Sequence, residues 1–186
     1  MNKLVNFVAL IRGRMLVFFV RLTNKNIVCG RGAHLYPGSR LEIAENSTMK
    51  VGKMLIANRN AQILVRGTLE LGSNVSLGYR TIINCHQNIS IGDNVNIAPD
   101  VKIYDHDHNF KDHPLSGNEW RTSFITEKIE IGSNVWIGAN TIILRGTIIG
   151  DNTVIGAGCI LKGKFDGNCV ITQKRNTSIK ALKADS

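Results

Sequence analysis

Three histidines, with carboxylates between them, mark the segment of this sequence best suited to chemistry. His106, His108 and His113 lie within YDHDHNFKDHPLSGNEWRTSFITEK, where Asp105 and Asp107 alternate with the first two. An unperturbed imidazole titrates near neutral pH and can take a proton from a hydroxyl group. A neutral imidazole can also ligate zinc, and a neighbouring carboxylate can orient a histidine. The segment therefore favours either general-base catalysis or a metal site.

The sequence around this segment repeats with a six-residue step. Leu or Ile leads each step, and Gly or Ala usually follows it. The leading residues are Leu71, Leu77, Ile83, Ile91, Ile97, Ile103, Ile131, Ile137, Ile143, Ile149, Ile155 and Leu161. Val51 leads a weaker, earlier turn of the same kind. A period of six fits neither an α-helix nor a simple alternating strand. It fits short strands joined by turns, with three hexads to a triangular coil, and so predicts an all-β solenoid.

The repeat stops after Ile103 and resumes at Ile129. Residues 104–128 are therefore expected to form a loop inserted into a rigid scaffold. Such loops often carry functional groups, because the scaffold fixes their position. We expect residues 25–182 to form one β-helical domain and this loop to contain the site.

Residues 1–24 are predicted to form an amphipathic helix. Two apolar stretches are divided by Arg12-Gly13-Arg14, and neither approaches the roughly 20 apolar residues needed to cross a bilayer. One interpretation is a helix that packs its apolar face on the rest of the protein. The other is an interfacial helix that contacts an anionic membrane surface through residues 1–22.

Charge and cysteine content exclude several classes of protein. The formal net charge of +9 is concentrated at the two ends of the chain. No nucleic-acid-binding motif accompanies it, so a nucleic-acid partner is not expected. The four cysteines are far apart and form no CxxC pair, which argues against a zinc ribbon or a disulfide scaffold. Unpaired cysteines indicate a reducing, cytoplasmic setting.

The stretch IEIGSNVWIGANTIILRGTIIGDNTVIGAGCIL closely resembles the hexapeptide-repeat acyltransferases. Within them, the chain is most similar to the galactoside and maltose O-acetyltransferases and to relatives in polysaccharide and capsule synthesis. The resemblance covers about residues 50–182. It implies a left-handed parallel β-helix and a homotrimer with active sites between subunits. It also implies transfer of an acetyl group from acetyl-CoA to a carbohydrate hydroxyl without a metal. With the basic, apolar N-terminus, it suggests an acceptor at the inner face of the membrane.

The resemblance also assigns roles to individual residues. It implies that His108 is the general base, with His106 as the rival. The backbone N–H near Ala139 would stabilise the oxyanion that forms as the thioester is attacked. Residues expected at the cofactor are Trp136, Ala139, Ala157, Lys162, Lys164 and Lys180. Residues expected at the acceptor are Asn84, Asp105 and His106.

The sequence departs from the galactoside enzymes at the acceptor site. Gly78 and His86 stand where those enzymes carry an asparagine and an aspartate, and the loop is longer. Simple galactosides and maltose are therefore not the expected acceptors. Two other classes stay open. One is a zinc-dependent, γ-type carbonic anhydrase-like enzyme using His86, His108 and His113, and the other is a non-catalytic β-helix scaffold.

Overall fold

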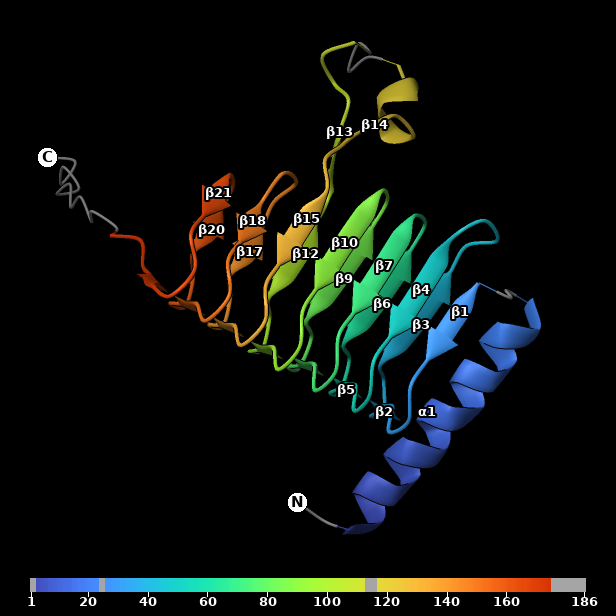
Figure 1. Cartoon of the computed structure of the whole chain (residues 1–186). Helices are drawn as coiled ribbons and strands as arrows, with labels where there is room; N and C mark the ends of the chain where they lie inside the picture. The colour runs from blue at the N-terminus through green and yellow to red at the C-terminus, as the bar shows by residue number, and fades with distance from the viewer. Residues whose placement is uncertain (1–2, 24–25, 113–116, 175–186) are drawn as a thin grey trace, which may run out of the picture.

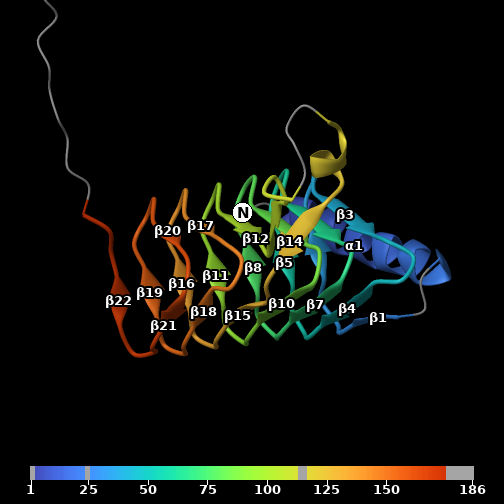
Figure 2. The same ribbon diagram turned by 90° about the horizontal axis from the view of Figure 1, so that it is seen from above.

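The architecture is a three-sided parallel β-helix with one helix at its N-terminal end. The computed structural model describes residues 3–23, 26–112 and 117–174. Helix α1 (Lys3–Thr23) lies at one end of the stack, and an inserted loop projects from one edge (Figure 1). Seen from above, the coils follow one another along a nearly straight axis (Figure 2). The prediction of a left-handed parallel β-helix of hexapeptide repeats, with an inserted loop and an N-terminal helix, is confirmed.

Successive strands enter three parallel sheets in turn. The first sheet contains β1 (Ile27–Cys29), β4 (Thr48–Val51), β7 (Thr68–Leu71), β10 (Asn88–Ile91), β15 (Ile129–Ile131), β18 (Ile148–Ile149) and β21 (Lys164–Phe165). The second contains β2 (His34–Leu35), β5 (Ile56–Ala57), β8 (Ser76–Leu77), β11 (Asn96–Ile97), β16 (Trp136–Ile137), β19 (Val154–Ile155) and β22 (Val170–Ile171). The third contains β3 (Arg40–Ile43), β6 (Gln62–Val65), β9 (Ile82–Cys85), β12 (Lys102–Tyr104), β17 (Ile142–Ile143) and β20 (Ile160–Leu161).

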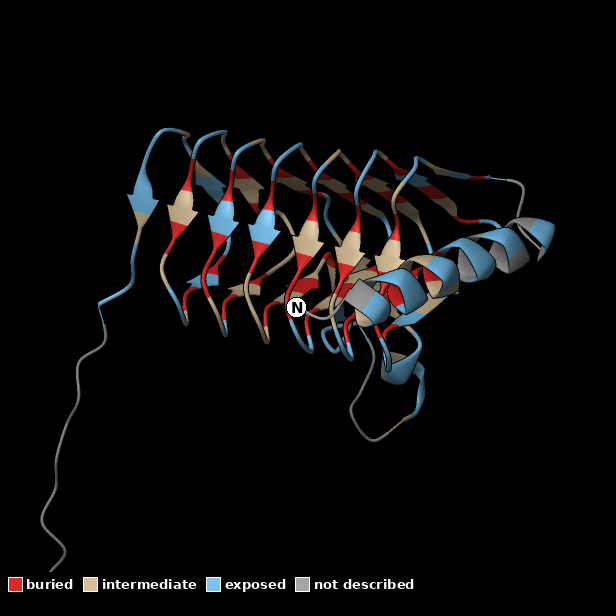
Figure 3. Ribbon diagram, turned by 90° about the horizontal axis from the view of Figure 1, so that it is seen from below, coloured by how far each residue is buried: buried red, intermediate tan, exposed pale blue. Residues whose placement is uncertain are grey.

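The core is a set of aliphatic columns along the axis of the β-helix. All twelve leading Leu and Ile residues of the predicted hexads are buried, none more than 4% exposed. Leu71, Ile91 and Ile131 lie side by side in register in the first sheet, and the other sheets repeat this arrangement. Figure 3 shows the buried residues gathered inside the stack. Each such side chain stabilises the fold by about 1.5–3 kcal/mol, so the repeat itself supplies the core.

The corner between the first and second sheets explains why glycine and asparagine recur in the repeat. A Cβ on Gly92 would lie 2.8 Å from the carbonyl carbon of Gly132 in the next coil, so only glycine fits. From the third coil on, one Asn per coil adopts a positive φ at this corner, a conformation that Asn tolerates better than most residues. Their side-chain amides form a ladder at 2.9–3.1 Å that runs through Asn74, Asn94, Asn134, Asn152 and Asn168.

The β-helix begins one coil before the weaker turn that Val51 leads. Cys29 pairs with Val51, and Leu41 pairs with Ile63, in the same register as the later coils. This first coil is hard to recognise in the sequence because a cysteine leads it. It gives α1 a surface to pack on.

Helix α1 is fixed to the first coil by one of its faces. Ala9 is buried there, and a Cβ on Gly13 would lie 2.1 Å from the carbonyl oxygen of Ala33. The guanidinium of Arg12 donates hydrogen bonds to the carbonyl oxygens of Tyr36 and Ser39, the latter at 2.7 Å. Among the described residues, no helix combines the length and the apolar content that crossing a bilayer requires.

Candidate active site

The candidate site lies at the corner where the third sheet turns into the first. Arg66 and His86 directly follow β6 and β9. His106, two residues after the end of β12, takes the equivalent position in the next coil. Parallel stacking in register therefore brings together three side chains that are twenty residues apart in the sequence. The inserted loop leaves the β-helix at this same corner (Figure 1).

The inserted loop begins and ends as a short antiparallel hairpin. Its strands are β13 (His106–His108) and β14 (Phe124–Thr126), with the 3-10 helix η1 (Glu119–Arg121) between them. Because side chains alternate along a strand, His106 and His108 share one face of β13 and Asp107 takes the other. Phe124 contacts both histidine rings from the facing strand, at centroid distances of 5.3 and 4.8 Å.

Arg145 fixes the base of this hairpin to the next coil. Its Nε donates to Oδ2 of Asp107 at 2.6 Å, and its Nη1 donates to Oε1 of Glu127. One guanidinium thus links the segments that lead into and out of the loop. The hydrogen bond to Asp107 is the main cause that raises the pKa of Arg145 above its ordinary value, so the link stays charged.

Asp105 is fully buried beneath the histidines and does not line the surface. Its carboxylate accepts backbone N–H bonds from His86, Gln87 and Asn88 at 2.7–2.9 Å. Burial alone would raise the pKa of Asp105, but hydrogen bonds from His106 and from these three N–H groups hold the pKa below its ordinary value. This ionised carboxylate orders the preceding coil and supports His106.

His86 and His106 stack face to face above this carboxylate. Their ring centroids are 3.6 Å apart, and Nδ1 of His106 lies 3.3 Å from Oδ1 of Asp105. Burial, followed by the neighbouring His106 and Arg66, lowers the pKa of His86 to about 4. His86 is therefore neutral at pH 7, and its Nε2 can accept a hydrogen bond from Nη1 of Arg66, which lies 3.4 Å away.

His108 is exposed and has a defined tautomer. Its Nδ1 lies 3.0 Å from the carbonyl oxygen of Trp120, and its ring packs edge-on against the Trp120 indole. A carbonyl only accepts hydrogen bonds, so Nδ1 carries a proton, and in the neutral imidazole Nε2 is the nitrogen with the lone pair. This is the form of imidazole that can act as a base.

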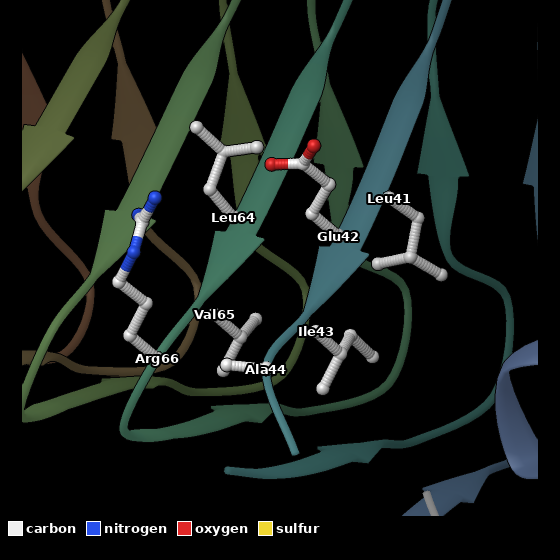
Figure 4. A pocket seen from close by; sticks show the side chains of 7 residues that line it. All are labelled: Leu41, Glu42, Ile43, Ala44, Leu64, Val65 and Arg66. Atoms are coloured by element: carbon white, nitrogen blue, oxygen red, sulfur yellow. The ribbon is translucent and has the colours of Figure 1, made fainter. Parts of the chain in front are cut away.

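Of the three residues expected at the acceptor, His106 and Asn84 remain accessible. They lie with His108 around one open hollow of about 350 Å³. The residues that line it are Arg66, Asn84, His86, His106, His108, Arg121, Thr122 and Phe124. A second hollow of about 400 Å³ lies next to it along the third sheet and shares Arg66 (Figure 4). Its one acidic residue, Glu42, is paired with Arg40.

The residues expected at the cofactor lie elsewhere on the same chain. Trp136 is half-exposed on the second sheet, and Ala139 and Ala157 follow that sheet at the corner before the third. Lys162 and Lys164 are exposed on the last coils, and Lys180 lies outside the described residues. The structure therefore brings Ala139 and Ala157 together, but it does not place them at the corner that carries His108.

The metal alternative finds no support in the described part of the chain. No group of three His, Cys, Asp or Glu side chains is arranged to ligate a metal there. His113 falls outside the described residues, and His86 stacks on His106. The nearby Cys85 thiol is buried, which raises its pKa to about 12, so it is not a nucleophile.

Several residues of the hollow did not stand out in the sequence: Arg66, Arg121, Thr122 and Phe124. Arg66 carried one usable signal, since it precedes His86 by the same twenty residues by which His86 precedes His106. That step equals the length of a coil in this region. The other three residues lie in the loop, where no periodicity indicates which side chains face His108.

The chain is similar to known transferases in sequence and fold. Residues 128–163 match the family model described as bacterial transferase hexapeptide (six repeats). A probable acetyltransferase of Mycobacterium tuberculosis is 29% identical over 117 residues, which are 62% of this chain and 37% of that protein. The chain thus spans little more than a third of this relative. The similarity to hexapeptide-repeat acyltransferases is confirmed.

Two solved structures share the fold. A mutant of AntD, an N-acyltransferase from Bacillus cereus in complex with dTDP and coenzyme A, has a TM-score of 0.67 at 20% identity and covers 84% of each chain. A hexapeptide-repeat acetyltransferase from Vibrio cholerae, complexed with acetyl coenzyme A, has a TM-score of 0.50 at 17% identity. That match covers 81% of this chain and 67% of the other.

Proposed function

We propose that this chain, which carries the bacterial transferase hexapeptide repeat over residues 128–163, transfers an acetyl group from acetyl-CoA to a sugar hydroxyl. The observation that carries the proposal is the hydrogen bond that holds the Nδ1 proton of His108, together with the position of its ring at the hollow. Its Nδ1 proton is held by the Trp120 carbonyl, and its ring lines an open hollow large enough for a sugar ring. Acetyl-CoA is the proposed co-substrate because the family resemblance and the coenzyme A complexes of proteins with this fold agree on it.

The proposed reaction is a direct transfer in a ternary complex. The acceptor oxygen attacks the thioester carbon while Nε2 of His108 takes the hydroxyl proton. The resulting oxyanion accepts a hydrogen bond from the backbone N–H near Ala139. The intermediate then expels the coenzyme A sulfur, which takes the proton from His108. Asp105 and His106 position this corner of the β-helix, and Asn84 contacts the acceptor.

The first experiment measures coenzyme A release from acetyl-CoA with a panel of sugars, nucleotide sugars and the matching amino sugars. Acceptor-dependent release with hydroxyl sugars is expected, and mass spectrometry of the product would place the acetyl group on oxygen. Acetylation of amino sugars alone would show that the acceptor nucleophile is an amine and not a hydroxyl. An amine is the nucleophile that the description of AntD as an N-acyltransferase implies. Absence of acetyl-CoA binding would overturn the proposal and favour a non-catalytic scaffold.

The proposal includes a homotrimer with active sites between subunits. In one chain, His108 and Ala157 lie at different corners of the β-helix, so a cleft between two chains can unite them. A subunit-mixing experiment tests this directly. His108→Ala and Ala157→Trp should each be inactive alone, the second because it fills the groove for the pantetheine arm. Mixed trimers should regain activity, and no recovery on mixing would contradict a shared site.

The outer face of α1 supports a peripheral membrane contact at the inner, cytoplasmic face. Its exposed apolar side chains follow the spacing of one helical stripe: Leu4, Phe7, Val8, Ile11, Met15, Phe18 and Leu22. The face that carries Ala9 and Arg12 packs on the first coil, whereas the side chains of this stripe are exposed. The first acidic residue of the chain is Glu42, which makes the N-terminal region purely basic and complementary to anionic lipid.

Vesicle co-sedimentation tests the membrane contact. The protein should sediment with vesicles containing phosphatidylglycerol and much less with phosphatidylcholine alone. The double variant Phe7→Ser, Phe18→Ser should lose most of this binding. The matched control, Val28→Ser with Val170→Ser, also removes two exposed apolar side chains, but from the β-helix. Equal loss in both variants, or binding independent of lipid charge, would contradict the proposal.

A further inference from the structure

The hollow around His108 carries positive charge and no acidic side chain. Of its eight lining residues, Arg66 and Arg121 are the cations, and none is Asp or Glu. The two arginines come from opposite sides of the site. Arg66 belongs to the corner that follows β6, whereas Arg121 ends η1 in the inserted loop. An open hollow of this kind attracts an anion.

The two arginines differ from three others on this molecule because no acid of the described residues pairs with them. Arg40, Arg80 and Arg145 are each paired with Asp or Glu side chains. Within the described ranges, neither Arg66 nor Arg121 lies within ion-pair distance of a carboxylate.

The contacts of these two arginines are with neutral groups. Nη1 of Arg66 lies 3.3 Å from Oδ1 of Asn84 and 3.4 Å from Nε2 of His86, which is neutral at pH 7. Arg121 lies over the face of the Trp120 ring, 5.6 Å from its centroid. A guanidinium stacked in this way keeps its N–H edge available for a carboxylate or a phosphate.

The two acids beside His106 and His108 in the sequence do not cancel this charge, and Glu119, two residues before Arg121, is not among the residues that line the hollow. Asp105 is buried and its oxygens are occupied by three backbone N–H groups. Asp107 lies on the opposite face of β13, where it is paired with Arg145. Asp105 and Asp107 are thus turned inward or away, and the two arginines line the hollow.

We infer that the acceptor carries an anionic group, a carboxylate or a phosphate, which docks on Arg66 and Arg121 beside the hydroxyl that receives the acetyl group. This inference rests on the proposed function and narrows its substrate class to acidic or phosphorylated sugars. Planar guanidinium groups bind both anions through paired hydrogen bonds. Docking of this group orients the sugar ring so that one hydroxyl reaches His108.

The test compares acceptors that differ only in the anion. Methyl glucuronide and methyl glucoside share a ring but differ in the carboxylate, and a hexose 1-phosphate supplies the phosphate arm. For both binding and turnover, the acidic acceptor that fits should be preferred by about 10-fold or more over methyl glucoside. The preference should weaken at high salt. Whichever of methyl glucuronide and the hexose 1-phosphate binds more tightly identifies the anion as a carboxylate or a phosphate.

Substitutions then assign the preference to the two arginines. Arg66→Gln and Arg121→Gln should each lower kcat/KM for the acidic acceptor about 10-fold more than they lower kcat/KM for methyl glucoside. Arg66→Lys should restore part of the loss, because it keeps the charge without the planar fork. Arg59→Gln is the control, since it removes an exposed arginine at a different corner of the β-helix.

The outcomes separate this inference from the proposed function. If the wild type binds and acetylates methyl glucoside as well as the acidic sugars, the inference is wrong and the acetyltransferase remains. If acidic sugars bind but acetyl-CoA does not, the anion site stands and the proposed function fails. If Arg66→Gln weakens acetyl-CoA binding instead, the arginines serve the cofactor phosphates, and the inference is overturned.

Discussion

Nδ1 of His108 lies 3.0 Å from the carbonyl oxygen of Trp120, and this contact decides what the imidazole can do. The Trp120 carbonyl holds the Nδ1 proton on the loop side. In the neutral imidazole, the lone pair of Nε2 is therefore left for a substrate. The contact joins β13 to η1, two segments of the inserted loop. The loop therefore supplies the candidate base and also fixes its tautomer.

Replacing His108 is expected to remove the chemical step while leaving cofactor binding intact. His108→Ala should lower kcat about 100-fold or more, because a general base contributes about 10²–10⁴-fold. Calorimetry should show unchanged acetyl-CoA affinity. His106→Ala provides the comparison, since His106 is largely covered by its neighbours. A larger loss of kcat for His106→Ala than for His108→Ala would reverse the assignment of the base.

Arg145 is expected to act as a positioning residue. Arg145→Gln removes the link between Asp107 and Glu127, so the hairpin should lose its fixed orientation. We expect kcat to fall about 10-fold with little change in the KM for acetyl-CoA, in line with small misplacements of catalytic groups. Hydrogen exchange of amides 106–109 and 123–127 should accelerate. Arg80→Gln, which breaks a comparable surface pair with Asp100, should change neither measurement.

Asp105 is expected to make the stability of the β-helix depend on pH in the acidic range. The folded-state pKa lies below the unfolded value of about 3.9, so the stabilisation is complete above that value and is lost as pH falls through the folded pKa. Melting temperatures should drop in this window, and Asp105→Asn should flatten part of the drop. At pH 7 this variant should be destabilised by about 1–3 kcal/mol. Asp166→Asn, at an exposed position, should behave like the wild type.

The asparagine ladder is expected to contribute through backbone conformation as well as through hydrogen bonds. Asn94 has a φ of 56° and forms amide contacts with Asn74 and Asn134. Asn94→Ala should lower the free energy of unfolding by about 2 kcal/mol, since alanine is strained at positive φ. Asn94→Gly should cost less, because glycine relieves the strain and loses only the side-chain bonds. Denaturant unfolding measures both, and equal losses would show that the strain is unimportant.

The sequence alone determined the β-helix, because the repeat is local and each hexad carries its own core and corner residues. Leu71, Ile91 and Ile131 are buried as their spacing predicts. The sequence also placed the candidate site in the break of the repeat, and the family resemblance chose His108 within it. It could predict this much because a rigid scaffold and an inserted loop are both visible in the periodicity.

Only the tertiary structure decided which side chains surround that base. Arg66 and His86 reach His106 through the stacking of successive coils, and Arg121 reaches them through the loop. The structure also decided which face of α1 packs on the first coil, the face of Arg12 and Gly13, and which apolar side chains stay exposed. The twenty-residue step from Arg66 to His86 and His106 is the one periodic trace of these relations in the sequence. The positions of Arg121 and of the outer face of α1 depend on loop conformation and on contacts between residues far apart in the chain, which leave no such trace.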